Sequence, residues 1–417
     1  MPKNNRRAQG TGSIYKRTVT RSGREYTYWE GSVTVGYDPG SGRQVRKSFT
    51  GKTQKEVREA MQAAAVEVQE GTFFEPSKLT VAQWFETWLS EYCGDKKYLT
   101  VKQYRSMYET HIKPALGAVK LSKLTPPQVQ GFYNELGRTG RTVTKRDRKG
   151  GVTTERAPLS AKTVKNIHGI MSKSFDTAMR QGLIKRNPAE LATVPKVEKK
   201  EVCPLTEEQI KAFMAACDGD EYGRIFKLII FTGLREGEAI GLTWDCVNFE
   251  SGTLKISKQL QKRPERDGGY TFAPLKNDKA RVLTVAPFVI QLLREQRSRQ
   301  AEERLAAGEG WQGWQNEKER DTALVFTKPD GIHVDATVLY KHYKRIAESI
   351  GAPESRVHDL RHTFAVLSLQ NGDDVKTVQG NLGHATAAFT LDVYGHVSER
   401  MREDSAARMQ SYIENLA

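Results

Sequence analysis

The sequence predicts a multidomain α+β protein: a small three-stranded sheet with one helix, then a helical domain, then a mainly α domain with a small β-sheet. Its 417 residues are too many for a single hydrophobic core. Short β-type segments broken by turns fill the first 51 residues, whereas helical spacing of apolar residues dominates from residue 80 onward. These observations place the domains at residues 1–75, 78–190 and 205–417.

The first domain is expected to pack one helix on a small sheet. Its strands are predicted at Ser13–Val19, Tyr26–Tyr37 and Gln44–Phe49, and the segment Asp38-Pro-Gly-Ser-Gly is a strong turn signal. Apolar residues at helical spacing predict a helix over Thr53–Glu70, with Thr53 as its N-cap.

This first domain is also strongly basic. Its first 50 residues hold ten Lys and Arg against three acidic residues, with Tyr and Trp between them. A small sheet with this charge suits a DNA groove, as in β-ribbon DNA-binding proteins. A module that only improves solubility is the alternative interpretation.

The middle domain is predicted to be helical. After a connector at residues 72–78, helices fit Thr80–Ser90, Thr100–Thr110, Pro126–Leu136 and Ser160–Gln181. Residues 138–158 carry seven Lys and Arg against two acids and show no periodicity, so we expect a mobile loop that either contacts phosphates or is simply solvated. Residues 183–204 read as a linker to the next domain.

The third domain is expected to be mostly helical. Short β-type segments interrupt it at Thr253–Lys258, Tyr270–Phe272, Arg281–Val285 and Leu324–Phe326. The C-terminal segment Ser398–Ala417 has apolar residues at roughly helical spacing. We expect this segment to dock on a neighbouring protomer, and a terminal helix packed on its own protomer is the alternative.

Composition favours a polyanionic partner. The chain has 65 Lys and Arg against 50 Asp and Glu, a formal net charge of +15 and a pI near 9.5. Such an excess suits a nucleic acid, because every phosphate that a cation neutralises releases counterions. The four cysteines show no metal-ligand spacing, and the polar N-terminus and short apolar runs indicate neither a signal peptide nor a membrane span. We therefore expect a cytoplasmic protein with reduced thiols, no cofactor and no bound metal.

A set of Arg, His and Tyr residues carries the predicted chemistry. Together they can hold a phosphate and attack it without a metal ion. The segments are Thr232-Gly-Leu-Arg235-Glu-Gly-Glu238, His358-Asp-Leu-Arg361-His362, Leu382-Gly383-His384 and, ten residues later, Tyr394.

Tyr394 is the candidate nucleophile. Its attack on a phosphodiester would form a phosphotyrosine and conserve the bond energy, so that strands can be rejoined without ATP. A phenol with a pKa near 10 needs precise positioning and cations at the non-bridging oxygens. The guanidinium forks of Arg235 and Arg361 suit that role, and a lysine on a turn can protonate the leaving 5′ oxygen.

These segments resemble the boxes of the tyrosine recombinase (phage integrase) family. Thr-Gly-Leu-Arg235-x-x-Glu238 is similar to the first box, His358-x-x-Arg361 to the second, and Leu-Gly-His384 followed by Tyr394 to the third box and nucleophile. The segment Lys276-Asn-Asp-Lys-Ala-Arg281 resembles the family's β-hairpin, in which a lysine precedes an arginine by five positions.

The resemblance implies a role for each residue. Arg235 and Arg361 would clamp the scissile phosphate with help from His384, and His358 would take part in proton transfer. Lys276 would be the general acid, a role for which Lys279 competes, and Tyr394 would be the nucleophile. Two further residues lie outside this set: Glu238 is expected to orient Arg235 or cap local amides, and His362 to pack the helix.

The resemblance also implies function and partners. It predicts a site-specific recombinase that integrates and excises a mobile element through a 3′-phosphotyrosine and a Holliday junction. Residues 1–75 resemble arm-type DNA-binding modules, and residues 78–190 a core-binding SAM-like domain. Double-stranded DNA with core and arm sites, a tetramer on DNA, and accessory excision and DNA-bending proteins are the expected partners, with no membrane involved.

Further basic and aromatic residues are DNA-binding candidates. For Tyr26 and Trp29, as for Tyr15, packing in the core of the small domain is an equally good interpretation. The candidates are Arg17, Arg24, Tyr26, Tyr28, Trp29, Arg43, Arg46, Lys47, Lys102, Arg105, Arg138, Lys162 and Lys165.

Three other functions are alternatives to site-specific recombination. A type IB-like topoisomerase shares the chemistry but does not need an arm-type module. A DNA-binding regulator without catalysis conflicts with the intact boxes. A metal-dependent nuclease lacks an Asp/Glu cluster for a two-metal site in the sequence.

Overall fold

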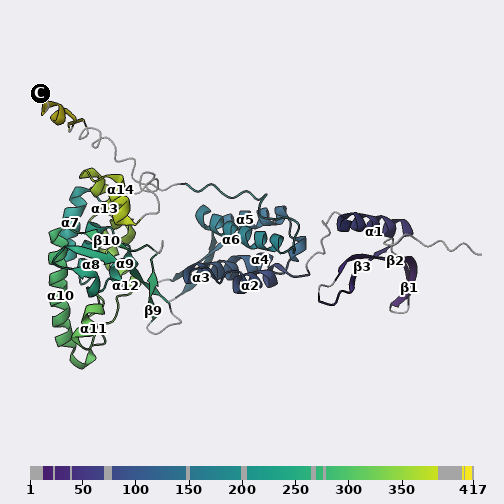
Figure 1. The fold of residues 1–417 in the computed structure, drawn as a ribbon, viewed down its shortest axis with the longest axis horizontal. Coiled ribbons are helices and arrows are strands. Elements are labelled where there is room, and N and C mark those ends of the chain that lie inside the picture. Colours follow the sequence, from purple (N-terminus) through teal and green to yellow (C-terminus); the bar gives the residue numbers. More distant parts are fainter. Residues whose placement is uncertain are drawn as a thin grey trace, which may run out of the picture. The chain divides into compact units, whose positions relative to one another are not determined.

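The structure is a computed structural model. It describes residues 13–21, 24–37, 40–69, 78–146, 151–198, 204–263, 269–275, 279–383, 406–407 and 409–415. The chain divides into two compact units, residues 1–198 and residues 199–417 (Figure 1). Helices and small antiparallel sheets confirm the predicted α+β class. Within the described ranges, no helix is long and apolar enough to cross a membrane.

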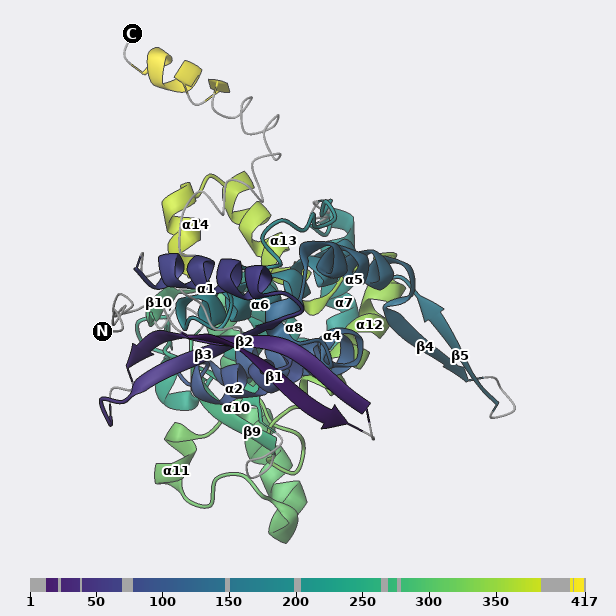
Figure 2. The ribbon, with the colours of Figure 1, turned by 90° about the vertical axis from the view of Figure 1, so that its right-hand side faces the viewer.

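A three-stranded antiparallel sheet with one helix forms the start of the first unit. Its elements are β1 (Ile14–Arg21), β2 (Arg24–Tyr37), β3 (Gln44–Gly51) and α1 (Gln54–Gln69). β2 is the central strand, and α1 lies across one face (Figure 2). Val33 of β2 meets Val57 and Met61 of α1 in a small core. The Glu56 amide donates to Thr53 Oγ1 at 3.2 Å, which confirms Thr53 as the N-cap.

The helices that follow in the first unit share a larger core. They are α2 (Val81–Glu91), α3 (Tyr98–Met107), α4 (Lys113–Leu116), α5 (Pro126–Thr139) and α6 (Ala161–Arg180). A π-helical turn at Tyr108–Ile112 joins α3 to α4. Thr80 and Gln83 form a capping box at the start of α2, whose apolar side chains Trp84 and Phe85 are fully buried, as their spacing predicts.

Residues 138–158 differ from the expected mobile loop. α5 continues to Thr139, and the strands β4 (Arg141–Arg146) and β5 (Val152–Ala157) then pair antiparallel. The turn at residues 147–150 lies outside the described residues. The prediction was wrong because the lack of apolar periodicity was given more weight than the run of Val and Thr residues, which favours strands.

The predicted linker at 183–204 begins later than expected. Ile184, Ala189 and Ala192 are buried in the core of the helices. The Asn187 side chain donates to Asp176 Oδ1 at 2.7 Å and accepts from the Ala189 amide at 2.9 Å. Short apolar residues between prolines therefore attach this stretch to the helical core.

The second unit surrounds a buried helix with further helices and short strands. The helices are α7 (Glu207–Asp218), α8 (Gly223–Thr232), α9 (Glu236–Ile240), α10 (Pro287–Ala307), α11 (Glu317–Thr322), α12 (Ala336–Ser349), α13 (Val357–Gln370) and α14 (Val375–Leu382). The strands are β6 (Val247–Asn248), β7 (Thr253–Ile256), β8 (Lys258–Lys262), β9 (Tyr270–Pro274) and β10 (Arg281–Thr284). The strand order is β10-β7-β6 in one sheet, and β8 pairs with β9 in another.

One predicted strand of this unit was wrong. Leu324 makes only an isolated bridge to Thr243, and Val325 and Phe326 are buried in the main core. A short apolar run does not distinguish a strand from any other buried segment. At the C-terminus, residues 409–414 are helical with Met409, Tyr412 and Ile413 exposed, and docking of this segment on a neighbour stays a prediction.

α8 positions the candidate site. Its residues from Ile225 to Ile230 are almost fully buried, so the end of the helix is held firmly within the unit. α13 packs against α8 and also contacts α14. Three segments that are far apart in sequence are thereby brought together.

Candidate active site

Arg235 lies where the chain turns from α8 into α9. α8 ends at Gly233, which has the left-handed φ of 66°. A Cβ atom on Gly233 would lie 2.5 Å from Phe364 Cδ1 and 2.7 Å from Leu382 Cδ2, so both the backbone angle and the packing require glycine. The turn places Arg235 at the N-cap of α9, as the sequence predicts.

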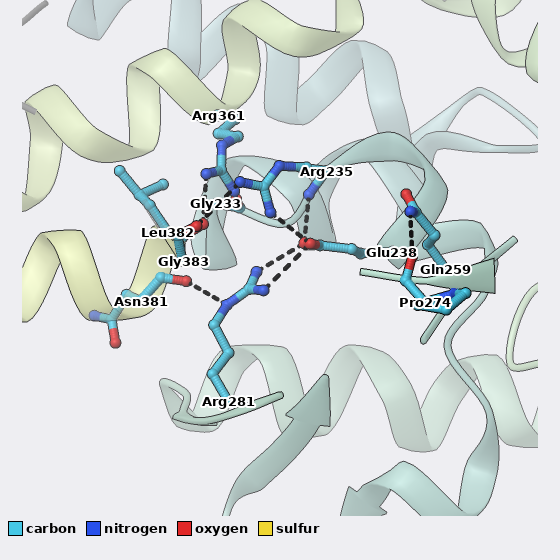
Figure 3. Close-up of polar contacts among 10 residues, drawn as sticks. All are labelled: Gly233, Arg235, Glu238, Gln259, Pro274, Arg281, Arg361, Asn381, Leu382 and Gly383. Carbon is cyan, nitrogen blue, oxygen red and sulfur yellow. Dashed lines mark hydrogen bonds and ion pairs between the residues drawn. The ribbon is translucent and has the colours of Figure 1, made fainter. Parts of the chain in front are cut away.

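Glu238 is a buried carboxylate that holds two arginines (Figure 3). Oε1 accepts hydrogen bonds from Arg235 Nη1 at 2.7 Å and Arg281 Nη1 at 3.2 Å. Oε2 accepts from Arg281 Nη2 at 2.7 Å and the Arg235 amide at 3.0 Å. Burial alone would raise the pKa of Glu238, but Arg281, together with Arg235, lowers it to about 2. Glu238 therefore both orients Arg235 and caps its amide.

Arg361 is almost completely buried, with 2% of its surface exposed. Its guanidinium donates hydrogen bonds to the carbonyl of Gly233, at the end of α8, and to the carbonyl of Leu382, at the end of α14. Carbonyls in the last turn of a helix have no helical partner and carry the negative end of the helix dipole. The two helix ends therefore stabilise a cation that would otherwise be costly to bury.

The end of α14 joins three arginines. Three consecutive carbonyls there each accept a hydrogen bond from a different guanidinium, immediately before His384 in the chain (Figure 3). The pairs are Asn381 with Arg281 at 2.8 Å, Leu382 with Arg361, and Gly383 with Arg235 at 3.2 Å.

This arrangement can bind an oxyanion. The group contains three guanidiniums and one carboxylate, Glu238, so it keeps an excess of positive charge. A guanidinium has five N–H donors, and the side-chain hydrogen bonds of Arg235 to Glu238 and Gly383 use two of them. The Arg235 side chain is 20% exposed, which gives an anion access to a fork that the protein already holds in place.

His358 lies three residues before Arg361, in the first turn of α13. Its ring centroid is 5.0 Å from that of His362, with the rings nearly perpendicular. Desolvation by the surrounding protein, followed by the charges of His362 and Arg361, lowers the pKa of His358 to about 4. Because the residue is exposed at the surface, solvent screening limits the size of this pKa shift but not its direction. Burial also lowers the pKa of His362. Both rings are therefore neutral at pH 7, and a neutral imidazole can accept a proton.

Three predicted catalytic residues lie outside the described residues: Lys276, His384 and Tyr394. The structure describes their chain neighbours Leu275, which is buried after β9, and Gly383, which ends α14 in the left-handed conformation. The roles of the three residues stay predictions. Among the residues that the structure does describe, no group of three or more His, Cys, Asp and Glu could hold a metal ion.

Arg281 is the residue that the sequence analysis missed. It served only to locate Lys276 by spacing, yet its side chain is 10% exposed and connects Glu238 to the end of α14. An arginine between Ala280 and Val282 in a strand is a signal that could have identified it, because a charge in an apolar strand requires a partner.

The DNA-binding candidates of the first sheet divide between its two faces. Strand register places Arg17 opposite Tyr28 and Arg46 opposite Thr34 on the face away from α1, where Arg17 also pairs with Glu30 at 2.9 Å. Tyr26 is on this face and exposed, as is Tyr15, whereas Trp29 packs in the core under α1 and Lys47 alternates to that side. Arg43 is exposed before β3, and the Arg24 side chain lies outside the described part of the chain.

The other candidates are exposed on the helices. Arg105 of α3 lies 3.9 Å from Glu109, and Lys102 lies 5.7 Å from the Tyr98 ring. Arg138 ends α5, and Lys162 and Lys165 lie in the first turns of α6. Their exposure leaves all of them candidates for contact with DNA.

Two family models match the chain. Residues 204–401 match the phage integrase family, and residues 80–137 match the phage integrase N-terminal SAM-like domain. Between them, the two models cover more than half of the chain. The first contains every predicted catalytic residue.

Two similar proteins match over nearly their whole length. A tyrosine recombinase XerC-like protein of Caldanaerobacter subterraneus subsp. tengcongensis is 28% identical over 94% of this chain and 97% of its own. The ICEBs1 integrase of Bacillus subtilis is 24% identical over 91% and 96%.

Solved structures share the fold. The Tn1549 transposon integrase in complex with a circular intermediate DNA matches with a TM-score of 0.61 and 21% identity, over 81% of this chain and 100% of its own. A lambda integrase tetramer bound to a Holliday junction matches with a TM-score of 0.52 and 17% identity, over 88% and 93%.

Proposed function

The chain belongs to the phage integrase family of tyrosine recombinases, and from this membership we propose that it is a site-specific DNA recombinase that integrates and excises a mobile element. It cuts one strand of each DNA partner and holds the 3′ end as a phosphotyrosine. The free 5′ hydroxyl of the other partner then attacks this bond. Two such rounds pass through a Holliday junction.

The observation that carries this proposal is the convergence of three arginines on the end of α14. His384 follows this helix end directly, and Tyr394 lies ten residues further along the chain. A preformed group of guanidiniums can stabilise the charge that develops on the non-bridging oxygens during transfer.

Each residue then has a role in a balanced step. The Tyr394 oxygen attacks phosphorus, the bond from phosphorus to the 5′ oxygen breaks, and the electron pair leaves on that oxygen. The leaving oxygen takes a proton from the Lys276 ammonium, and the phenol proton passes to a base, for which neutral His358 is the candidate. Arg235 and Arg361 hold the phosphate, with His384 assisting.

Duplex DNA is the proposed substrate. We assign arm-site binding to residues 1–75, core-site binding to residues 78–190 and catalysis to residues 205–417. A tetramer on DNA, accessory excision and DNA-bending proteins, and action in the bacterial cytoplasm complete the proposal. Its support is the net charge of +15 and the relatives whose structures contain DNA or a Holliday junction.

A suicide core site tests the chemistry. Wild-type protein, incubated with a nicked attachment-site oligonucleotide that loses its free 5′ end after cleavage, should accumulate a covalent adduct that mass mapping places on Tyr394. Tyr394→Phe should bind the same DNA and form no adduct. An adduct that persists in this variant would reject Tyr394 as the nucleophile.

Deletion of residues 1–75 tests the arm assignment. The shortened protein should still cleave an isolated core site, because its catalytic residues are intact, while integration on arm-bearing DNA decreases. Full integration activity after the deletion would contradict the assignment.

A further inference from the structure

β4 and β5 form a ribbon with no hydrophobic core of its own. They pair over six residues each, and the side chains of Thr142, Thr144, Val152 and Thr154 are exposed. Figure 2 shows the two strands projecting beyond α5. An isolated two-stranded hairpin is only marginally stable in water, and beyond its base the exposed strands gain little from packing within their own unit.

The base of the ribbon is nevertheless firmly attached. The Leu159 amide donates to the Leu136 carbonyl at 3.0 Å, and Leu159 packs on the core of the helices. Gly140 is so close that an added Cβ would lie 3.0 Å from Leu159 Cδ1. Strands of six residues extend about 20 Å, so a fixed base carries the ribbon well away from the helices.

Positive charge lies on both faces of the ribbon. The sequences of the two strands hold four basic residues and one acidic residue. Arg141 is paired with Ala157, and Arg156 with Thr142, so the two arginines belong to successive pairs and point to opposite faces. Both are exposed. A ribbon that lies flat on another protein would instead present one apolar face to it.

We propose that the β4–β5 ribbon binds duplex DNA by entering a groove beside the core site. The major groove is about 12 Å wide and admits a two-stranded ribbon. Basic side chains on both faces would let the ribbon contact phosphates of the two DNA strands that border the groove. Arginine and threonine side chains are common partners of the backbone phosphates. Arg138 and Lys162, at the helix ends next to the base, extend the basic surface. This inference rests on the proposed function, which makes duplex DNA the substrate.

Affinity and footprint measurements on full-length protein test the ribbon. Two variants are needed: Arg141→Gln with Arg156→Gln, and a deletion in which Asn-Gly replaces residues 141–157. The control is Lys211→Gln with Lys341→Gln, which removes the same charge from exposed sites on α7 and α12.

The arginine pair should weaken binding to a core-site duplex by roughly three- to tenfold at 0.15 M salt. The slope of log affinity against log salt should fall by about two, because each phosphate contact contributes about 0.9. Hydroxyl-radical protection should be lost only on one flank of the core site. The control should retain that protection.

Unchanged affinity, slope and footprint in both ribbon variants would overturn the inference. So would normal binding of one protomer combined with failure of two protomers to assemble, which would identify a protein contact instead. A thermal melting transition checks that the deletion variant folds. If the deletion variant does not fold, the double arginine variant alone tests whether the ribbon binds DNA. If the wild-type protein forms no phosphotyrosine adduct, the proposed recombinase function fails, while the footprint still decides the role of the ribbon.

Discussion

The protein holds its arginines in two different ways. In the candidate active site, Arg235, Arg281 and Arg361 bind a buried carboxylate or helix-end carbonyls and are 20%, 10% and 2% exposed. In the β4–β5 ribbon, Arg141 and Arg156 are open to solvent. A cation that stabilises a transition state must be in position before the reaction, whereas one that only adds affinity can adjust to its partner.

This difference sets the cost of losing each arginine. Removing one from the active site leaves buried hydrogen-bond acceptors without a partner, which costs about 1–3 kcal/mol for each group in addition to the chemical role. Removing an arginine from the ribbon leaves only groups that water can solvate. Such surface substitutions usually change the free energy of unfolding by no more than about 0.5 kcal/mol.

Arg361→Ala is expected to have the largest effect. It should reduce single-turnover cleavage of a suicide core site by roughly a thousandfold, because it removes the proposed phosphate ligand and leaves two helix-end carbonyls without their hydrogen-bond donor. Arg356→Ala is the matched control, since that arginine starts the same helix but is 68% exposed and pairs with Asp359. Similar losses of cleavage rate in both variants would contradict the distinction between arginines that buried hydrogen bonds hold in place and arginines that are exposed to solvent.

Glu238→Gln is expected to have the second largest effect. The cleavage rate should fall about a hundredfold and the free energy of unfolding by about 3 kcal/mol, because an amide cannot replace a carboxylate that two arginines share. Its pH dependence sharpens the test. The folded-state pKa is about 2 and the ordinary value 4.5, so this stabilisation is present above pH 4.5 and is lost as pH falls toward 2. Denaturant titrations should show a flatter acid dependence in the Gln variant. Parallel wild-type and variant profiles would contradict this role.

Arg281→Lys should have a smaller effect. The charge is kept, but one ammonium cannot bind both oxygens of Glu238 and the Asn381 carbonyl together. We expect cleavage to fall about tenfold with little change in DNA affinity, measured by single-turnover rates at saturating protein. Lys255→Arg, the reverse exchange on the neighbouring strand β7, should change neither value. An affinity loss without a rate loss would mean that Arg281 binds DNA rather than positions Glu238.

The smallest effect concerns pH. Because the pKa of His358 is lowered from 6.5 to about 4, the ring should stay neutral between pH 6 and pH 8 in the free protein. Histidine-selective NMR, assigned with His358→Gln, should show a titration midpoint well below 6.5. Bound core-site DNA should raise that midpoint, because a phosphate favours the charged ring. A midpoint near 6.5 in the free protein would show that the site does not lower the pKa of His358.

The parts of the site that a local motif encodes could be predicted. Gly233, Arg235 and Glu238 lie within six consecutive residues, so their spacing alone indicates a helix start with an acidic residue that caps it. The role of Arg281 depends on β10 lying beside α14, one hundred residues later, and no local pattern contains that contact. Backbone carbonyls as arginine ligands have no sequence signature at all.

The ribbon was missed for a related reason. Strands are recognised by apolar residues on alternate positions, which mark a face packed on a core. β4 and β5 have no such face, and their Val and Thr content is a weaker signal. The roles of Lys276, His384 and Tyr394 depend on motif order alone and stay predictions.

Gly233 has a consequence for how such sequences are classified. A methyl group at this position would strain the backbone and push against Phe364 and Leu382, separating the helix ends that hold Arg361. A natural variant with alanine there would keep every predicted catalytic residue and could still be classified as an active enzyme, while its Arg361 would lose the paired helix ends that hold it. Surveys that separate working mobile elements from decayed ones should therefore inspect this backbone position alongside the side chains that perform the chemistry.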